Sequence, residues 1–313
     1  MLFGNPMSMS IRHGRQRGAP IPMPMNTSPV AVIGSTGFVG SSVVRILESE
    51  GIAIIPISTR ECNLLDKEAV QGLEQLLPQG ASVVFCSAIT RVVRDSYETM
   101  LQNIQMVQTF ATVARRRRVS NVIYMSTTDV YGYMPPVPIT EATVASPENY
   151  YGLSKLAGEL LLQIDGGLGC PVSILRLSGI YGTGDGERSI VGRLTERMCR
   201  DGVVTIFGDG RVRRDYVEVG GVTDLVATLL RKPYHGTMNV ATGTSISIGE
   251  LVQLIAQHAG LSPGIKYAPA EPLRAGDQVF DITRLRQYAH NLRMKPIHEG
   301  VVGYLEATLK ALR

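Results

Sequence analysis

Gly34-Ser-Thr-Gly37-Phe-Val-Gly40 is the stretch of sequence that decides the fold. It follows the apolar residues Val32 and Ile33, which are typical of a strand, and it precedes a run with the apolar spacing of a helix. Bare backbone at such a turn lets a pyrophosphate approach, and the amino terminus of the helix then stabilises the negative charge. An ordinary tight turn between a strand and a helix is the alternative. The residues that this loop offers to a dinucleotide cofactor are Gly34, Thr36, Gly37, Phe38, Val39 and Gly40.

On both sides of this loop, short β-branched runs alternate with runs of helical spacing. The predicted strands are 32–33, 52–57, 83–85, 121–125 and 172–175. The predicted helices are 38–49, 67–77, 96–116 and 150–163. This alternation predicts an α/β fold with a Rossmann-type, doubly wound parallel sheet.

The alternation divides the chain into unequal parts. Residues 1–29 lack the apolar segment of a signal peptide and are expected to be a disordered tail, and residues 30–178 form the predicted dinucleotide-binding Rossmann domain. After about Gly179 the pattern weakens, which predicts that residues 179–313 are mainly a smaller substrate-binding lobe, with some segments returning to the Rossmann domain. Because ligands bind at the carboxyl ends of parallel strands, the site is expected between the lobes.

The composition excludes several classes of protein. Of the 313 residues, 44% are hydrophobic, and the formal net charge is only +4, so neither a disordered chain nor a nucleic-acid-binding protein is indicated. The basic run 115–118 closes a predicted helix, where cations complement the helix dipole. No apolar run is long enough to span a bilayer, so no membrane association is expected.

The cysteines indicate the compartment. Their spacing includes no C-x-x-C pair, so it indicates neither a zinc site nor a disulfide framework, and no metal is expected. Buried thiols in a reducing, cytoplasmic setting are the prediction. The four residues are Cys62, Cys86, Cys170 and Cys199.

Tyr151-Gly-Leu-Ser-Lys155 supplies the first candidate for chemistry. A spacing of four places the phenol and the ammonium on one face of the predicted helix 150–163. A tyrosine normally titrates near pH 10, and a nearby positive charge from Lys155 is expected to lower that pKa toward the range of a proton shuttle. By itself the pair also fits a half-exposed helix surface.

Hydroxyl residues at the end of the strand 121–125 strengthen that interpretation. Ser126, Thr127 and Thr128 precede Asp129 and an aromatic turn, some two dozen residues before Tyr151. A hydroxyl there can hold a substrate oxygen beside the phenol. Taken alone, such residues are commonly found where a strand ends in a turn.

The end of the second strand bears on cofactor choice. NAD enzymes usually place a carboxylate there to bind the ribose hydroxyls, whereas this chain has Ser58-Thr59-Arg60 followed by Glu61. Arg60 is suited to a 2′-phosphate. The prediction is therefore NADP, with NAD still possible.

Six motifs in order resemble those of the extended short-chain dehydrogenase/reductases, specifically the NAD(P)-dependent nucleotide-sugar epimerase/dehydratase family. They are GSTGFVG, MSTTDVYG, PITEATVASPENYYGLSKLAGE, LRLSGIYGTGDG, IFGDGRVRRDYVEV and MNVATG. The resemblance runs from about Val32 to the end of the chain. It implies an oxidoreductase or isomerase that acts on a nucleoside-diphosphate sugar.

The resemblance also implies roles for single residues. Tyr151 is the acid/base, Lys155 orients the nicotinamide ribose, and Thr127 bonds the reacting oxygen. Residues 60–66 are similar to the corresponding segment of GDP-fucose synthases, which use NADPH. The further positions that match cofactor-binding residues are Asn63, Leu64, Ser87, Ala88 and Asn103.

For the substrate, the resemblance implies a site in the carboxyl-terminal half. Arg214 and Arg274 match arginines that bind the nucleotide of the sugar nucleotide, and a guanidinium fork suits a phosphate. A surface ion pair between Arg214 and Asp215 is the alternative. Thr128 and Ser178 also match substrate-binding positions, although Ser178 stands where the family usually has asparagine.

Three reactions remain open at this point. Hydride transfer at sugar C4, by an epimerase or a 4-ketoreductase, ranks first because the chain without its tail is compact. A dehydratase or decarboxylase that uses Asp129 in place of a glutamate is the second. A non-catalytic protein that senses NADP(H) or acts as a scaffold is the third. The family further implies a homodimer formed by the helices around 96–114 and 150–163.

Overall fold

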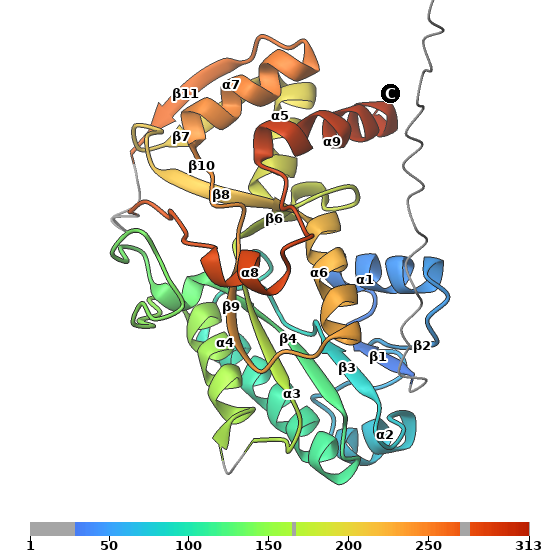
Figure 1. The fold of residues 1–313 in the computed structure, drawn as a ribbon. Coiled ribbons are helices and arrows are strands. Elements are labelled where there is room, and N and C mark those ends of the chain that lie inside the picture. The colour runs from blue at the N-terminus through green and yellow to red at the C-terminus, as the bar shows by residue number, and fades with distance from the viewer. Residues whose placement is uncertain (1–28, 165–166, 270–275, 313) are drawn as a thin grey trace, which may run out of the picture.

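The strands build a six-stranded parallel sheet in the order β2-β1-β3-β4-β5-β9 (Figure 1). The computed structural model describes residues 29–164, 167–269 and 276–312. The expected tail, apart from Pro29, and Arg274 lie outside the described residues. The parallel sheet confirms the predicted fold class.

The sheet and its covering helices follow the sequence in regular alternation. The strands of the main sheet are β1 (Val30–Ile33), β2 (Ile54–Ile57), β3 (Ser82–Phe85), β4 (Asn121–Thr127), β5 (Val172–Leu177) and β9 (Gly236–Val240). The helices around it are α1 (Phe38–Ser49), α2 (Ala69–Leu76), α3 (Tyr97–Arg116), α4 (Tyr150–Leu161), α6 (Val219–Arg231) and α8 (Thr283–Tyr288). A short 3₁₀ turn, η1 (Thr128–Tyr131), follows β4 directly.

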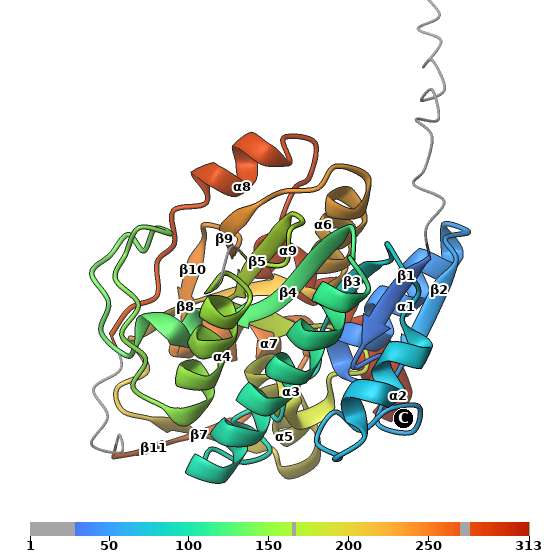
Figure 2. The same cartoon turned by 90° about the horizontal axis from the view of Figure 1, so that it is seen from below.

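Each face of the sheet has its own hydrophobic core, because side chains alternate along a strand. Val30 and Val32 of β1 pack with α1 and α6, whereas Ala31 and Ile33 pack with α2 and α3. Figure 2 shows α3 and α4 side by side on this second face. Burial on both faces explains why the strands read as continuous apolar runs in the sequence.

Two differences from the predicted elements have physical causes. β2 begins at Ile54 rather than at residue 52, because the amide of Ile52 still bonds to the carbonyl of Leu47 at the end of α1. β9 was not predicted as a strand, since Gly236, Thr237 and Asn239 give it little strand character. Its pairing with β5 in the interior of the protein compensates for this composition.

The remaining elements form a smaller lobe over the carboxyl ends of the sheet. Its strands are β6 (Gly179–Tyr181), β7 (Val203–Phe207), β8 (Arg213–Glu218), β10 (Ser245–Ser247) and β11 (Gly264–Ala268). Its helices are α5 (Ile190–Asp201), α7 (Ile248–Ala259) and α9 (Ile297–Leu312), with a 3₁₀ turn η3 (Gly186–Arg188). β6 follows β5 with one residue between them, so the two lobes are joined directly at the strand ends. In the part of the chain that the structure describes, no helix is both long and apolar enough to cross a membrane.

A buried ion pair fastens α4 to the sheet. The Glu159 carboxylate accepts hydrogen bonds from Ser126 Oγ and from the guanidinium of Arg176, with Nη2 to Oε2 at 2.7 Å. Arg176 in turn lies over the ring of Tyr131, 4.9 Å from its centroid. Removing one member of a buried pair leaves the other charge uncompensated.

We therefore expect Glu159→Gln to lower the free energy of unfolding by about 3–5 kcal/mol. The measurement is the midpoint of urea unfolding followed by circular dichroism. Arg231→Gln is the control, because Arg231 pairs with Glu50 at the surface and should cost less than about 1 kcal/mol. Equal losses from the two variants would contradict the assigned role of Glu159.

Candidate active site

A cavity of about 770 Å³ lies where the strand ends of the main sheet meet the smaller lobe. β1 and β3 are neighbours whose following segments diverge, and this is the point at which such sheets bind ligands. The predicted site residues that line the cavity are Gly37, Phe38, Val39, Gly40, Ala88, Thr127, Thr128, Asp129, Tyr151, Lys155, Ser178 and Arg214. The structure thus brings the predicted acid/base, the glycine loop and a phosphate-binding candidate to one space.

The glycine loop has the geometry that a pyrophosphate needs. Gly34 adopts φ +86°, and a Cβ on Gly40 would lie 2.1 Å from the carbonyl oxygen of Gly34, so only glycine allows this turn. Gly37 caps α1 without any side-chain hydrogen bond, which leaves amides of the first turn available to a ligand. Gly34 and the exposed Thr36 support the loop without lining the cavity. These residues fit a dinucleotide.

At the end of β2, the Arg60 side chain is exposed, whereas the Glu61 carboxylate is already hydrogen-bonded within the protein. The Glu61 carboxylate accepts hydrogen bonds from the amide and the hydroxyl of Ser58, at 2.8 and 2.6 Å, and these bonds lower its pKa. Among the described residues, Arg60 forms no ion pair. The arginine, rather than the carboxylate, is therefore the side chain that this strand end offers to a ligand.

Besides Gly34, Thr36 and Arg60, four residues predicted to contact the cofactor do not line the cavity. The Leu64 side chain is buried in the core beneath α3, and the Asn63 amide bonds to Asp66 within a turn, with Nδ2 to Oδ1 at 2.7 Å. Ser87 Oγ faces the sulfur of Met106. Asn63, Leu64 and Ser87 therefore match the motif positions of the family, but their side chains do not form part of the cavity wall.

Asn103 is the fourth, and it has a structural task. Its amide nitrogen donates to the Ile89 carbonyl at 3.0 Å and to Ser154 Oγ at 3.2 Å, while its oxygen accepts from the Ile89 amide at 2.7 Å. The side chain thus joins the segment after β3 to the catalytic helix α4. It positions the cavity wall rather than forming it.

The first turn of α4 is fixed against η1, which determines where Tyr151 lies. Asn149 caps the helix by accepting from the amide of Gly152 at 2.6 Å, and Asp95 accepts from the amide of Tyr151 at 2.9 Å. A Cβ on Gly152 would lie 2.7 Å from the carbonyl oxygen of Asp129, so the close packing requires glycine. This contact brings Asp129 near the phenol.

Burial dominates the protonation of Tyr151 and Lys155. It lowers the pKa of Lys155 to about 8, with Cys86 and Glu159 opposing the shift. Burial raises the pKa of Tyr151. The Asp129 charge raises it further, whereas the Arg91 charge lowers it. The charges that act on the Tyr151 phenol are those of Asp129 and Arg91, so the expected lowering of its pKa by Lys155 is not found in this structure. Lys155 Nζ lies 5.9 Å from the Tyr151 ring centroid and donates to the Met125 carbonyl at 2.7 Å.

Thr127 is arranged to donate a hydrogen bond into the cavity. Its Oγ1 accepts from the amide of Asp129 at 3.2 Å, as the cap of η1. Accepting at the oxygen leaves the hydroxyl proton free for a ligand oxygen. Thr128 is buried in the adjoining wall.

Asp129 is paired with an arginine that the sequence did not single out. Arg91 Nε lies 3.1 Å from Asp129 Oδ2, and it comes from the segment between β3 and α3. Burial raises the pKa of Asp129, while the Arg91 and Arg214 charges lower it. Residues 90–93 of this segment also line the cavity, so one short loop covers the site.

Arg214 and Asp215 face different partners, because side chains alternate along β8. The Asp215 carboxylate accepts from the amides of Thr242 and Gly243 at 2.8 and 2.9 Å, and Arg214 Nη1 donates to the Gly276 carbonyl at 2.6 Å. The alternative of an Arg214–Asp215 surface ion pair is therefore wrong. Asp215 stabilises the smaller lobe and leaves Arg214 to the cavity.

Several cavity residues were missed because their motifs carry no chemistry by themselves. Cys86 follows a strand, Tyr216 lies within a strand, and Arg188, Arg193 and Gln278 come from segments with weak periodicity.

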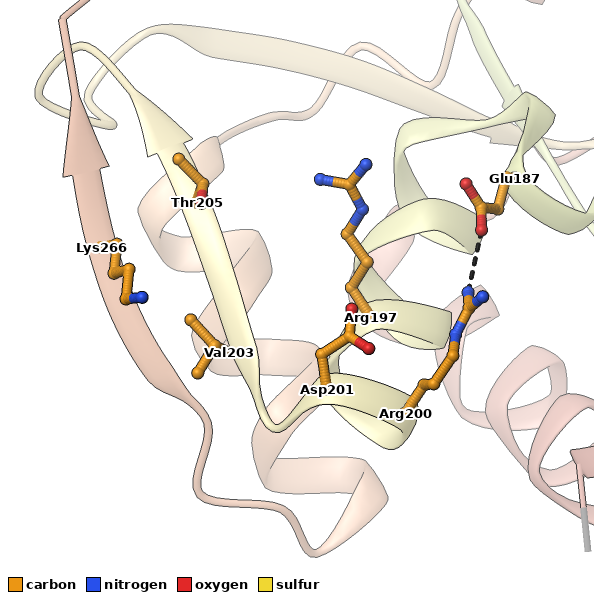
Figure 3. Close-up of a pocket in the computed structure, with 7 residues that line it drawn as sticks. All are labelled: Glu187, Arg197, Arg200, Asp201, Val203, Thr205 and Lys266. Atoms are coloured by element: carbon orange, nitrogen blue, oxygen red, sulfur yellow. Dashed lines mark hydrogen bonds and ion pairs between the residues drawn. The ribbon is translucent and has the colours of Figure 1, made fainter.

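A second hollow, of about 380 Å³, lies on the smaller lobe between α5 and β7 (Figure 3). Arg197, Arg200 and Lys266 line it, and Arg200 pairs with Glu187 at 2.8 Å. Cations in the last turn of α5 complement the helix dipole. The hollow shares no lining residue with the main cavity.

A parallel sheet with a glycine loop, and a Tyr-Lys pair on a helix beside it, define a dinucleotide-dependent enzyme of the Rossmann type. The chain belongs to the NAD dependent epimerase/dehydratase family, whose sequence profile matches residues 30–241. It is 26% identical to dTDP-4-dehydro-6-deoxy-D-allose reductase of a Streptomyces species, over 82% of this chain and 89% of that protein. It is 25% identical to an uncharacterized UDP-glucose epimerase of Bacillus subtilis, over 89% of this chain and 98% of that one. Among solved structures, the UDP-glucose 4-epimerase of Thermus thermophilus, complexed with NAD, matches 90% of this chain and 99% of its own, with TM-score 0.81 and 25% identity.

Proposed function

We propose that this protein reduces a 4-keto nucleoside-diphosphate sugar with NADPH. The observation that carries the proposal is that the phenol of Tyr151 lies in the cavity that the glycine loop, Lys155 and Arg214 also line. A protonated phenol is the form that ketone reduction requires. The similarity to a dTDP-4-keto-sugar reductase supports the same direction.

The chain's own residues supply the proton and the orientation. Tyr151 gives its proton to the ketone oxygen, and Thr127 donates a hydrogen bond to the same oxygen as negative charge develops on it. Lys155 binds the ribose beside the nicotinamide, and the amides at the start of α1 hold the pyrophosphate. When bound, NADPH would supply the hydride, which would leave the alcohol and NADP⁺ as products.

Two features support NADPH and a nucleotide-linked substrate. Arg60 is exposed at the end of β2, where a guanidinium can pair with a 2′-phosphate, and Glu61 is occupied by Ser58. Arg214 lines the same cavity, and its guanidinium is suited to the diphosphate of the sugar nucleotide.

Epimerisation at C4 with a tightly held NAD is the second candidate, and the similarity to UDP-glucose epimerases favours it. Dehydration or decarboxylation by Asp129 is less well supported, because Arg91 holds that carboxylate in an ion pair. A non-catalytic role is disfavoured because Tyr151, Lys155 and Thr127 all line one cavity.

The first experiment determines cofactor and substrate class. Purified protein is denatured and the released nicotinamide is identified by mass, and thermal shifts are then recorded with NADPH, NADH, UDP and dTDP. Stabilisation by NADPH supports the reductase, whereas stoichiometric bound NAD supports the epimerase. Tyr151→Phe should lower turnover about a hundredfold or more while it retains NADPH binding. Full activity of that variant would exclude the proposed chemistry.

Arg91→Met tests the electrostatics of the site through its pH profile. Alcohol oxidation by the same enzyme requires the phenolate, so its rate rises as pH increases toward the Tyr151 pKa. Because the Arg91 charge lowers the pKa of Tyr151 and of Asp129, its removal should move this rise to higher pH. Arg94→Met is the control, since the ion pair of the Arg94 side chain among the described residues is with the exposed Glu98, at 4.0 Å. An unchanged pH profile in Arg91→Met would disprove the effect of the Arg91 charge on Tyr151. Separately, a reaction product lighter than the substrate by one water would indicate a dehydratase.

We also infer that the chain forms a homodimer through α3 and α4. These adjacent helices carry exposed apolar side chains, which are Tyr97, Leu101, Tyr150, Leu153 and Leu160. An apolar surface of this kind is typical of a protein interface.

Leu153→Glu should convert the dimer to a monomer, because it places a charge in the proposed interface. Sedimentation velocity gives the mass. Val302→Glu on α9 is the matched control and should remain dimeric. A monomeric wild type, or a dimeric Leu153→Glu, would refute the interface.

A further inference from the structure

A buried carboxylate lies behind the part of the cavity wall that the start of α5 forms. Asp185 belongs to the segment between β6 and α5, and it is 2% exposed. It does not line the cavity. A carboxylate is buried where hydrogen bonds replace the water that it loses, so its partners indicate its task. The residues that follow it and do line the cavity are Arg188, Ser189, Ile190 and Arg193.

Three segments of the smaller lobe meet at the Asp185 carboxylate. Its Oδ2 accepts hydrogen bonds from the amide of Gly182, at 3.2 Å, and from the hydroxyl of Ser189. Its Oδ1 accepts from the phenol of Tyr304 on α9, at 3.0 Å. Burial raises the pKa of Asp185, and these hydrogen bonds oppose the rise. One side chain therefore holds both ends of the segment 182–189 and attaches the segment to α9.

The same side chain fixes where α5 begins. Ser189 caps α5, because its hydroxyl accepts from the amide of Gly192 at 2.8 Å while it donates to Asp185. A Cβ on Gly192 would overlap the carbonyl oxygen of Gly186, so the segment packs directly against the first turn of α5. The position of this turn in the cavity wall thus depends on Asp185.

The wall that begins α5 is cationic. Arg188 and Arg193 form no ion pair among the residues that the structure describes. Both line the cavity together with Arg214 of β8. Guanidinium groups are suited to phosphate oxygens, and a hydrogen bond between charged groups depends on the placement of both.

We propose that Asp185 is a positioning residue for the nucleotide sugar. It holds the first turn of α5, and with it Arg188 and Arg193, in place for the diphosphate of the substrate, and the phenol of Tyr304 holds Asp185. This inference rests on the proposed function, in which the smaller lobe binds the nucleotide of the substrate. A small displacement of binding groups is costly even when it begins far from the ligand.

The test begins with Tyr304→Phe, which removes the hydrogen bond from α9 at a residue that does not line the cavity. Calorimetric titration of the NADPH-loaded protein measures the affinity for UDP, dTDP and GDP, and a separate titration measures the affinity for NADPH. The nucleotide that the wild type binds should bind about three- to tenfold more weakly to the variant, which corresponds to one hydrogen bond. The NADPH affinity should be unchanged, because the glycine loop lies at α1.

Asp185→Ala tests whether Tyr304 acts through the carboxylate. This variant loses all three hydrogen bonds, so its nucleotide affinity should fall at least as far as that of Tyr304→Phe. Adding Tyr304→Phe to Asp185→Ala should cause no further loss, since the two residues belong to one network. If Asp185→Ala does not fold, Tyr304→Phe and its control decide the question.

Tyr181→Phe is the matched control. Its ring packs edge-on against that of Tyr304, with the centroids 5.6 Å apart, and its hydroxyl is buried without a partner among the described residues. The control therefore removes the same group from the neighbouring ring without removing a hydrogen bond to Asp185. Both affinities should equal those of the wild type.

Wild-type nucleotide affinity in Tyr304→Phe would overturn the inference while the proposed function stands. An equal loss of NADPH affinity, additive losses in the double variant, or the same loss in Tyr181→Phe would overturn it as well. A wild type that binds NADPH but none of the three nucleotides would refute the proposed function and this inference with it.

Discussion

The position of the catalytic helix depends on one buried carboxylate. Tyr151, Lys155 and Glu159 form a stripe with a spacing of four along α4, and each of the last two contacts β4. Lys155 bonds to the carbonyl of Met125, and Glu159 bonds to the hydroxyl of the next residue, Ser126. The register of α4 on β4 is thereby fixed one residue before Thr127. Arg176 extends this attachment to β5, so helix and sheet hold the phenol jointly.

Burial is also the main influence on the protonation of the ionisable side chains in the cavity. It disfavours the ionised forms of Tyr151, Lys155 and Asp129, so each group depends on its nearest partner. Arg91 compensates Asp129 from a loop, whereas the Glu159 charge favours the ammonium of Lys155 from the helix interior. The partner of Lys155 therefore comes from α4 itself, whereas the partner of Asp129 comes from the loop that lines the cavity.

The sequence alone was sufficient to predict those features that depend on short, continuous segments. The glycine loop, the alternating elements and the Tyr151–Lys155 spacing all depend on short segments, and the structure places them as predicted. Arg91 and Tyr216 were missed because their relation to the cavity depends on loop closure and strand pairing across distant segments. Asn103 and Leu64 were predicted to contact the cofactor from motif positions alone, and neither lines the cavity. Asn103 instead bonds to Ile89, and the Leu64 side chain enters the core.

The place of β9 in the sheet has a consequence for how the chain is assembled during synthesis. β5 ends at residue 177, but its partner on that side begins only at residue 236, after β6, α5, β7 and β8 of the smaller lobe have been made. Until then the edge of β5 has unpaired backbone groups, which is the condition under which sheets pair wrongly with other chains. Pairing across such a sequence separation is also slow. The two lobes are therefore not separable by cutting the chain between them, and the sheet is completed only when the nascent chain returns to it.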